Sequence, residues 1–230
     1  PRAPPTRAGC AALFEGGGAH GAKGPAAPPA AAAALAEPLA VALHAGARAG
    51  DVAGRHVALF GSGPIGLLCL LAARLEGAGA VTVVDIAEAP LAVARTLGAD
   101  AEMDLSGGEG PLVDLAAADP IDVVLEVSGT AAGLASAIRA VRRGGTIVQV
   151  GNLPGGEIPV PANAIMAKEL DVKGTFRFGE EFSRAVELIV SGEVDVMRLV
   201  TAQRPLSDAP EAFRLALDRS RSVKVVLSAE

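Results

Sequence analysis

The chain contains the stretch Val57-Ala58-Leu59-Phe60-Gly61-Ser62-Gly63-Pro64-Ile65-Gly66, and Asp85 follows its last glycine by nineteen residues. A short apolar run enters a Gly-x-Gly-x-x-Gly turn, and the helix-compatible run 67–74 leaves it. A second apolar run, 80–84, then ends on the acid. Strand, glycine turn, helix, strand and acid, in this order, are typical of a unit that binds a dinucleotide.

Each position of this turn has a physical role in such a unit. Gly61 permits the tight turn, Gly63 lets the backbone approach a pyrophosphate, and Gly66 lets the helix pack against the strand. The free N–H groups and the positive end of the helix then face the phosphates. Asp85 can accept hydrogen bonds from the two hydroxyls of the adenosine ribose. The alternative is a glycine turn with a purely structural role.

The acid also bears on the choice of coenzyme. The charge of Asp85 would repel the 2′-phosphate of NADP, and position 86 is Ile, with no neighbouring Arg to receive a phosphate. The sequence therefore predicts NAD rather than NADP.

Composition excludes several classes of partner. The net charge of −6 over 230 residues argues against nucleic acid or an anionic membrane as a partner, and the absence of Trp and Tyr leaves few platforms for stacking bases. No continuous apolar run reaches the length of a membrane span, and no signal-peptide pattern is visible. Cys10 and Cys69 give no disulfide framework. We expect a soluble, cytoplasmic protein.

Strands and helices are expected to alternate after the first thirty-four residues. The strands read as nearly continuous apolar runs, which suits a parallel sheet covered on both faces. The pattern predicts an α/β fold, a doubly wound Rossmann sheet of six strands with a crevice at their carboxyl ends. The expected strands are 56–60, 80–84, 101–105, 122–126, 145–150 and 171–176, and the expected helices are 35–45, 64–75, 89–97, 133–141 and 180–191.

The composition divides the chain into three parts. Residues 1–34 are rich in Pro, Ala and Gly, and we expect them to be poorly ordered because they cannot bury enough apolar surface. Residues 35–178 form the dinucleotide-binding domain. Residues 179–230 carry no nucleotide-binding signal; a helix near 209–219 and a final strand at 223–227 are expected there, in another layer or domain.

Several further motifs accompany the glycine turn and Asp85. They are Glu37-Pro38-Leu39-Ala40-Val41-Ala42-Leu43-His44-Ala45, Leu97-Gly98-Ala99-Asp100, Glu126-Val127-Ser128-Gly129, Asp171-Val172-Lys173-Gly174-Thr175-Phe176-Arg177-Phe178 and Leu199-Val200-Thr201. With these motifs the chain resembles the zinc-dependent medium-chain alcohol and polyol dehydrogenases, in the branch of sorbitol and L-idonate 5-dehydrogenases. The resemblance extends from residue 35 to about residue 227.

The resemblance implies a set of coenzyme-binding residues. The coenzyme contacts that it implies are Gly61, Gly63, Pro64, Ile65 and Gly66 at the pyrophosphate turn, Asp85 at the adenosine ribose, Ser128, Val150 and Gly151 on the nicotinamide side, and Phe176 in a segment that also reaches the coenzyme.

Two catalytic residues are also implied. Arg177 would lie near the hydroxyls of the substrate, and Glu37 would lie beside the catalytic zinc, bound to the metal or to its water. Each has a second interpretation from the residues alone. Glu37 is an acid in a first helical turn, where the helix dipole favours it, and Arg177 fits a solvent-facing strand end.

The implied activity is NAD-dependent oxidation of a secondary hydroxyl on a polyol or sugar acid, with L-idonate as the single best substrate. In this family a separate GroES-like catalytic domain supplies a cysteine and a Gly-His-Glu run to the zinc. We expect a truncated or frame-disturbed chain that retains a remnant of that domain, because its His and Cys residues show no metal-ligand spacing. Because zinc ligands are missing, we expect this chain to catalyse the oxidation poorly.

Two other functions remain open at this point. The chain could be a non-catalytic dinucleotide-binding module, or a zinc-free reductase of the same superfamily. A homo-oligomer is expected in each case, because relatives pair through the edge of this sheet, and residues 158–166 are a candidate contact.

Overall fold

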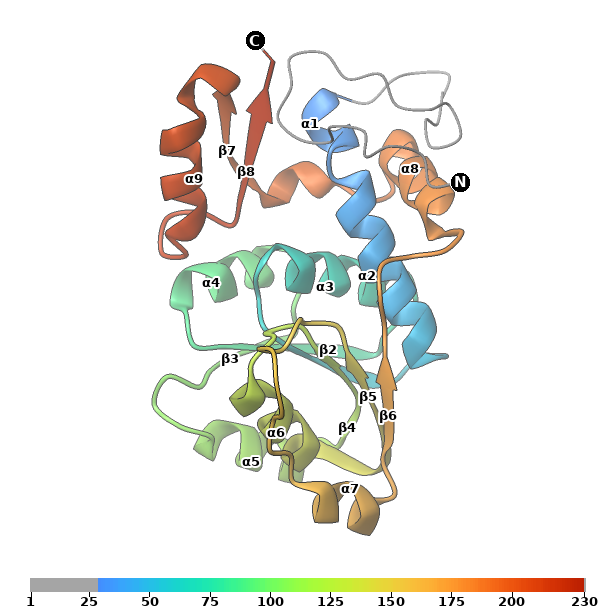
Figure 1. Cartoon of the computed structure of the whole chain (residues 1–230). Helices are drawn as coiled ribbons and strands as arrows, with labels where there is room; N and C mark the ends of the chain where they lie inside the picture. Colours follow the sequence, from blue (N-terminus) through green and yellow to red (C-terminus); the bar gives the residue numbers. More distant parts are fainter. Residues whose placement is uncertain (1–28, 230) are drawn as a thin grey trace, which may run out of the picture.

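Six parallel strands form the central sheet, in the spatial order β3-β2-β1-β4-β5-β6 (Figure 1). The structure, a computed structural model, describes residues 29–229. The strands of this sheet are β1 (His56–Phe60), β2 (Ala80–Asp85), β3 (Ala101–Asp104), β4 (Ile121–Glu126), β5 (Val141–Gln149) and β6 (Asp171–Gly174). The strand order reverses between β1 and β4, so a topological switch point lies there. The predicted six-stranded parallel sheet is confirmed.

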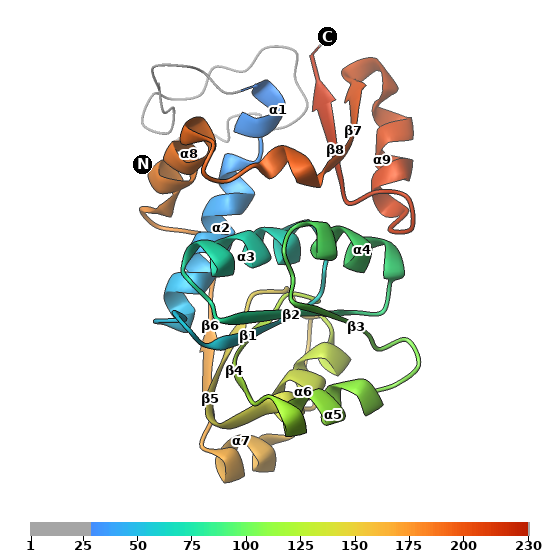
Figure 2. The ribbon, with the colours of Figure 1, turned by 180° about the vertical axis from the view of Figure 1, so that it is seen from behind.

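Helices cover both faces of this sheet (Figures 1 and 2). One face packs with α2, α3 and α4 into a first hydrophobic core, and the other packs with α5, α6 and α7 into a second. The doubly wound arrangement is therefore confirmed. The helices are α1 (Ala30–Ala33), α2 (Ala36–Ala49), α3 (Pro64–Leu75), α4 (Glu88–Thr96), α5 (Gly110–Ala118), α6 (Ala131–Ala140), α7 (Ala162–Lys168), α8 (Glu181–Ser191) and α9 (Ala209–Leu217), with 3₁₀ turns η1 (Val196–Leu199) and η2 (Leu206–Asp208).

Helices α5 and α7 lie in segments where the sequence predicted no element. Helix α5 begins with a glycine followed by Pro111 in its first turn and buries only Leu112 fully, and α7 spans seven residues with no fully buried side chain. An amphipathic period needs a longer window than such helices provide. Short surface helices of this kind therefore cannot be recognised from a periodic pattern in the sequence.

The N-terminal part of the described chain is helical. We expected residues 1–34 to be poorly ordered. Residues 1–28 lie outside the described residues, whereas residues 30–33 form α1, which buries Ala31 and Ala32 in the first core. Together α1 and α2 form a 20-residue stretch, Ala30–Ala49, that is long and apolar enough to cross a membrane by length and composition alone. Its Leu35 and Leu39 are fully buried, so it packs here as a core helix.

The C-terminal residues add a small second sheet. Strands β7 (Val200–Pro205) and β8 (Lys224–Ser228) pair in parallel, and α9 packs against them (Figure 1). We call β7, α9 and β8, with the turn that joins α9 to β8, the C-terminal lobe. The predicted terminal helix and strand are present, although β7 was not expected. Helix α8, just beyond residue 178, packs against α2 and shares the first core.

Candidate dinucleotide site

The glycine turn between β1 and α3 is constrained by its own backbone. Gly61 has a φ of 109°, and a Cβ there would lie 2.8 Å from the backbone nitrogen of Ser128. A Cβ on Gly66 would lie 1.9 Å from the carbonyl oxygen of Gly61. Gly63 differs, since a Cβ there would meet nothing within 4 Å. Gly61 and Gly66 are thus required by packing, while Gly63 leaves open space beside the turn.

A cavity of about 490 Å³ opens at the carboxyl ends of the strands next to this turn. Its walls include Gly61, Gly63, Asp85, Ser128 and Arg219. The cavity therefore lies at the switch point between β1 and β4, where doubly wound sheets hold their ligands. Four of the sequence-predicted site residues share it, and Arg219 is an addition.

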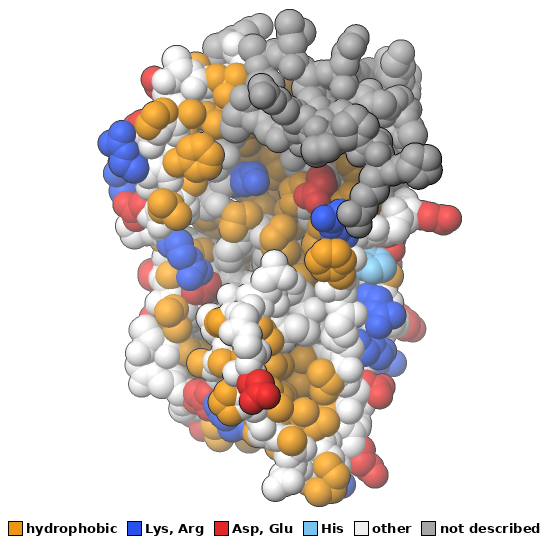
Figure 3. Space-filling model, viewed as in Figure 1, with side chains coloured by type: hydrophobic (Ala, Val, Ile, Leu, Met, Phe, Trp, Pro, Cys, Tyr) orange, Lys and Arg blue, Asp and Glu red, His pale blue; other side chains and the backbone are white. Residues whose placement is uncertain are grey.

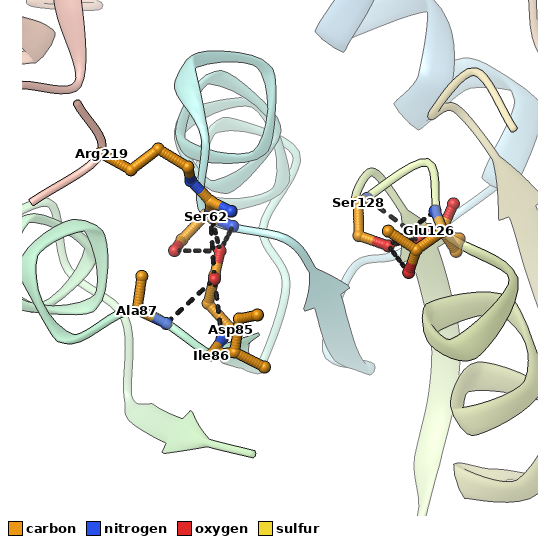
Figure 4. Close-up of polar contacts among 8 residues, drawn as sticks. Ser62, Asp85, Ile86, Ala87, Glu126, Ser128 and Arg219 are labelled. Carbon is orange, nitrogen blue, oxygen red and sulfur yellow. Dashed lines mark hydrogen bonds and ion pairs between the residues drawn. The ribbon is translucent and has the colours of Figure 1, made fainter. Parts of the chain in front are cut away.

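Asp85 ends β2 with its carboxylate buried in this cavity (Figure 4). Its Oδ2 accepts hydrogen bonds from the backbone N–H and the hydroxyl of Ser62, both at 2.7 Å, and its Oδ1 accepts from the N–H groups of Ile86 at 2.7 Å and Ala87 at 3.2 Å. Burial raises the pKa of this carboxyl, but the hydrogen bonds from Ser62 and Ile86 and the charge of Arg219 outweigh burial. The pKa of Asp85 consequently lies below its ordinary value, and the group is an anion at neutral pH.

Arg219 reaches this carboxylate from the turn after α9. Its Nη2 lies 3.0 Å from Oδ1 and 2.8 Å from Oδ2 of Asp85 (Figure 4). The prediction that no arginine lies near position 86 is wrong. Arg219 is 134 residues from Asp85 in the chain but contacts it in the folded structure. No local pattern marks this residue, since the contact depends on how the C-terminal lobe packs.

Glu126 is buried at the end of β4, next to the loop that carries Ser128. This fully buried side chain accepts hydrogen bonds from the N–H of Ser128 at 2.9 Å, from the Ser128 hydroxyl, from the N–H of Gly129 at 3.3 Å and from the amide of Gln149. It therefore holds the loop that carries Ser128. No role for Glu126 is predicted from the sequence, although a carboxylate at the end of an apolar strand is a visible signal.

A second cavity, of about 320 Å³, lies on the other side of Val127, which lines both. The structure brings Ile65, Val150, Gly151, Phe176 and Arg177 together there, all of them sequence-predicted site residues. Val41 of α2 and Thr175 also line this cavity.

The strand-end segment at this second cavity has two unusual features. Arg177 has a left-handed φ of 56°, and its guanidinium carbon lies 5.3 Å from the ring centroid of Phe176, which is 76% exposed. The buried Oγ1 of Thr175 has no hydrogen-bond partner among the described residues. Polar groups are thus available at this cavity for a ligand.

Two further predicted site residues are Pro64, within the glycine turn, and Glu37, on α2. Pro64 occupies the first turn of α3. Glu37 is exposed in the first turn of α2, one turn before Val41, and so on the side of the helix that faces the second cavity.

The part of the chain from residue 29 to 229 does not fit a catalytic zinc. No three His, Cys, Asp or Glu side chains in it come together as a metal site, whereas such a zinc takes about three protein ligands. The Nδ1 of His44 lies 2.8 Å from Glu181, and burial raises the pKa of the Cys69 thiol to about 12. Cys10 and His20 lie outside the described residues.

Comparisons with known proteins agree with this architecture. L-idonate 5-dehydrogenase (NAD(P)(+)) from Escherichia coli (strain K12) is 34% identical over 193 residues, which are 83% of this chain and 55% of that protein. Sorbitol dehydrogenase from Gallus gallus is 35% identical over 199 residues, covering 84% of this chain and 55% of that protein. The crystal structure of the Escherichia coli L-idonate 5-dehydrogenase superimposes with a TM-score of 0.82 at 33% identity, over 89% of this chain and 58% of that one.

The chain thus spans a little over half the length of the curated relatives it matches. A family model described as zinc-binding dehydrogenase matches residues 64–191, from the glycine turn to the end of α8. The resemblance seen in the sequence is confirmed. Because this match extends over more than half of its residues, the chain belongs to the zinc-binding dehydrogenase family.

Proposed function

We propose that this chain binds NAD⁺ and forms the coenzyme-binding part of a cytoplasmic dehydrogenase that oxidises a secondary alcohol on a polyol or sugar acid. One observation carries the proposal. The glycine turn, the start of α3 and the buried carboxylate of Asp85 meet in a single cavity at the switch point of the sheet. This is the combination of groups that recognises a pyrophosphate and a ribose diol.

The larger cavity suits the adenosine diphosphate half of the coenzyme. The open side of Gly63 leaves room for the pyrophosphate against the backbone, and the free N–H groups at the start of α3 can donate to it. Asp85 is kept ionised by its hydrogen bonds, so it can accept from both ribose hydroxyls at neutral pH.

The smaller cavity suits the nicotinamide half. Val150, Gly151 and Phe176 line it, Ser128 stands at the junction with the larger cavity, and the unpartnered hydroxyl of Thr175 can bond a carboxamide. The guanidinium of Arg177 is exposed at the rim and offers several N–H donors to substrate hydroxyls. Glu37, one turn from the cavity wall at Val41, is a candidate to bind a catalytic metal or its water in a complete relative.

The reaction that this arrangement serves is a hydride transfer. The carbinol C–H would pass its hydride to the nicotinamide while the hydroxyl releases a proton, giving a ketone, NADH and H⁺. Two relatives named for L-idonate and sorbitol support a polyol or sugar-acid substrate, with L-idonate as the first to test. Since residues 29–229 do not assemble a zinc site, we assign no step to a metal and expect impaired turnover.

A second candidate function is a dinucleotide-binding module without catalysis. The cavity lined by the proposed coenzyme residues, beside an incomplete set of metal ligands within the described chain, favours it. Metal content and turnover distinguish it from the dehydrogenase.

The test is an NAD⁺ titration by calorimetry on the purified chain, with elemental analysis for zinc and a dehydrogenase assay with L-idonate and sorbitol. NAD⁺ binding with turnover supports the dehydrogenase, and NAD⁺ binding without zinc or turnover supports the module. A chain that is folded by circular dichroism and binds no NAD⁺ would refute both.

We also infer that the protein is a homo-oligomer that pairs along β6. Within the described chain β6 pairs only with β5, so its other edge is free. Val172 on this strand is 46% exposed, and Val160 and Met166 in the preceding segment are exposed as well. Hydrophobic side chains gather over this part of the molecule in Figure 3, around α6 and α7. An unpaired edge strand beside apolar surface favours pairing with a second copy.

A further inference from the structure

Asp85 already accepts more hydrogen bonds than a carboxylate readily holds. Its Oδ2 receives two from Ser62, its Oδ1 receives two from the backbone of Ile86 and Ala87, and Nη2 of Arg219 contacts both oxygens. A carboxylate offers about four lone-pair positions, so these contacts already crowd it. The hydroxyls of a ribose diol must therefore displace a present partner to bind Asp85, and Arg219, which contacts both oxygens, holds two of the contacts.

Arg219 is the partner that can leave. Ser62 is fully buried, and the other donors are backbone groups of the chain next to Asp85. The side chain of Arg219 is 53% exposed and lines the 490 Å³ cavity. On departure the half-exposed guanidinium regains water, whereas the carboxylate of Asp85, only 4% exposed, needs the incoming ribose hydroxyls in its place.

The turn that carries Arg219 keeps it close to the cavity after release. The side chain of Asp218 accepts from the N–H of Ser220 at 3.1 Å and from its hydroxyl at 2.6 Å, and the Ser222 hydroxyl donates to the carbonyl of Leu215 at 2.6 Å. These bonds tie the turn to the end of α9. Arg219 is also the only cation among the described residues that line this cavity.

We propose that Arg219 is a coenzyme-selectivity residue that receives the 2′-phosphate of NADP⁺, so that the chain binds NADP⁺ as well as NAD⁺. The inference rests on the proposed coenzyme site. With NAD⁺, the two ribose hydroxyls replace Arg219 on Asp85. With NADP⁺, Asp85 repels the 2′-phosphate, and the guanidinium offsets that repulsion by pairing with phosphate oxygens in its forked geometry. Arg219 thus weakens the exclusion of NADP⁺ that Asp85 alone would impose.

The experiment compares ligands that differ only in this phosphate. Calorimetry measures the binding of NAD⁺, NADP⁺, 5′-ADP and 2′,5′-ADP to the full chain and to Arg219→Ala, Arg219→Lys and Arg221→Ala. Arg221 is the matched control, because it lies exposed in the same turn, and its charge acts on Asp218 rather than on Asp85. Circular dichroism and thermal unfolding establish that each variant is folded.

The native chain is expected to bind both coenzymes. Arg219→Ala should weaken NADP⁺ and 2′,5′-ADP by about 10- to 100-fold, the effect of one lost charge-assisted hydrogen-bond pair. It should bind NAD⁺ and 5′-ADP more tightly, because their ribose hydroxyls no longer have to displace the guanidinium. Arg219→Lys should give an intermediate loss, and Arg221→Ala should match the native chain.

Three results would overturn this role. They are a native chain that binds NAD⁺ but not NADP⁺, an Arg219→Ala variant that changes all four ligands equally, and a variant that binds NADP⁺ as the native chain does. Each leaves the NAD⁺ site in place. A native chain that binds none of the four ligands would instead refute the coenzyme site, and the role of Arg219 with it.

Discussion

The three glycines of the turn have two different roles, one in the packing of the fold and one in access for a ligand. Gly61 and Gly66 are required because a Cβ at either position would meet backbone atoms. Gly63 has an ordinary φ of −64° and open space on its Cβ side, so the folded chain tolerates a methyl group there. A bound pyrophosphate would occupy that space. The same residue type therefore serves packing at two positions and ligand access at the third.

Substitution of these glycines should resolve the two roles. Gly66→Ala should lower the free energy of unfolding by about 1–3 kcal/mol, because the added methyl group overpacks the turn. Gly63→Ala should unfold like the native chain but bind NAD⁺ more weakly. Gly155→Ala, on an exposed loop with nothing within 4 Å, is the control. Urea unfolding and calorimetry measure both quantities, and a Gly63→Ala variant with native affinity would contradict the prediction.

The charge at position 85 should set the balance between the coenzymes. In the double variant Asp85→Ser and Ile86→Arg, the repelling carboxylate is gone, and Arg219 no longer has it as a partner. We expect the ratio of NADP⁺ to NAD⁺ affinity to rise by about tenfold or more, the effect of about 1.4 kcal/mol. Binding titrations with both coenzymes measure the ratio, with Ile86→Ala as the control. An unchanged ratio would count against the ribose assignment of Asp85.

Among the elements, β6 is an edge strand of the central sheet, as β3 is at the opposite side, and apolar side chains are exposed on it and in the segment before it. Its exposed Val172 and the exposed segment before it favour pairing with a second copy. Light scattering should therefore give a mass near twice that of the 22.9 kDa chain, or a higher multiple. Val172→Lys should shift the protein toward the monomer, because charged side chains block edge pairing. Val113→Lys, on the exposed face of α5, is the control, and a strictly monomeric native chain would refute the inference.

The molecule as a unit should lose stability in acid. Five carboxyl groups outside the exposed C-terminal turn have pKa values below their ordinary range: Asp85, Asp100, Glu109, Asp122 and Glu181. For Glu109 hydrogen bonds from Arg139 and Ser136 are the leading cause; for the other four, burial raises the pKa but hydrogen bonds and nearby cationic groups outweigh it.

The sign follows from proton binding. As pH falls through the ordinary carboxyl range, near 4, the unfolded chain binds more protons than the native one. The free energy of unfolding contributed by these groups is therefore present above about pH 5 and is lost progressively below about pH 4. Each group adds at most about 1.4 kcal/mol per pH unit to the slope. Urea unfolding from pH 6 to 3 measures it, and Glu109→Gln should flatten the curve. A slope of the opposite sign would contradict the prediction.

The sequence predicted most where long apolar runs and local turns carried the signal. The first strand at 56–60 and the helix Pro64–Leu75 occur where they were expected, because each is a strong run bounded by glycine or proline. Asp85 and the glycine turn line one cavity, since a βαβ unit of about thirty residues brings them together. The short elements α5, α7 and β7 escaped prediction because their patterns are too brief to identify.

Local order in the chain was enough to specify the α/β class, the parallel sheet and the position of the glycine turn and Asp85 at the carboxyl ends of its strands. Those features depend on steric and periodic constraints between residues that are close in the chain. The pairing of Arg219 with Asp85, and the assembly of a second cavity from α2, the end of β5 and the segment after β6, depend on the packing of distant segments. Such contacts are properties of the packed fold, since no pattern within one segment encodes where another will dock.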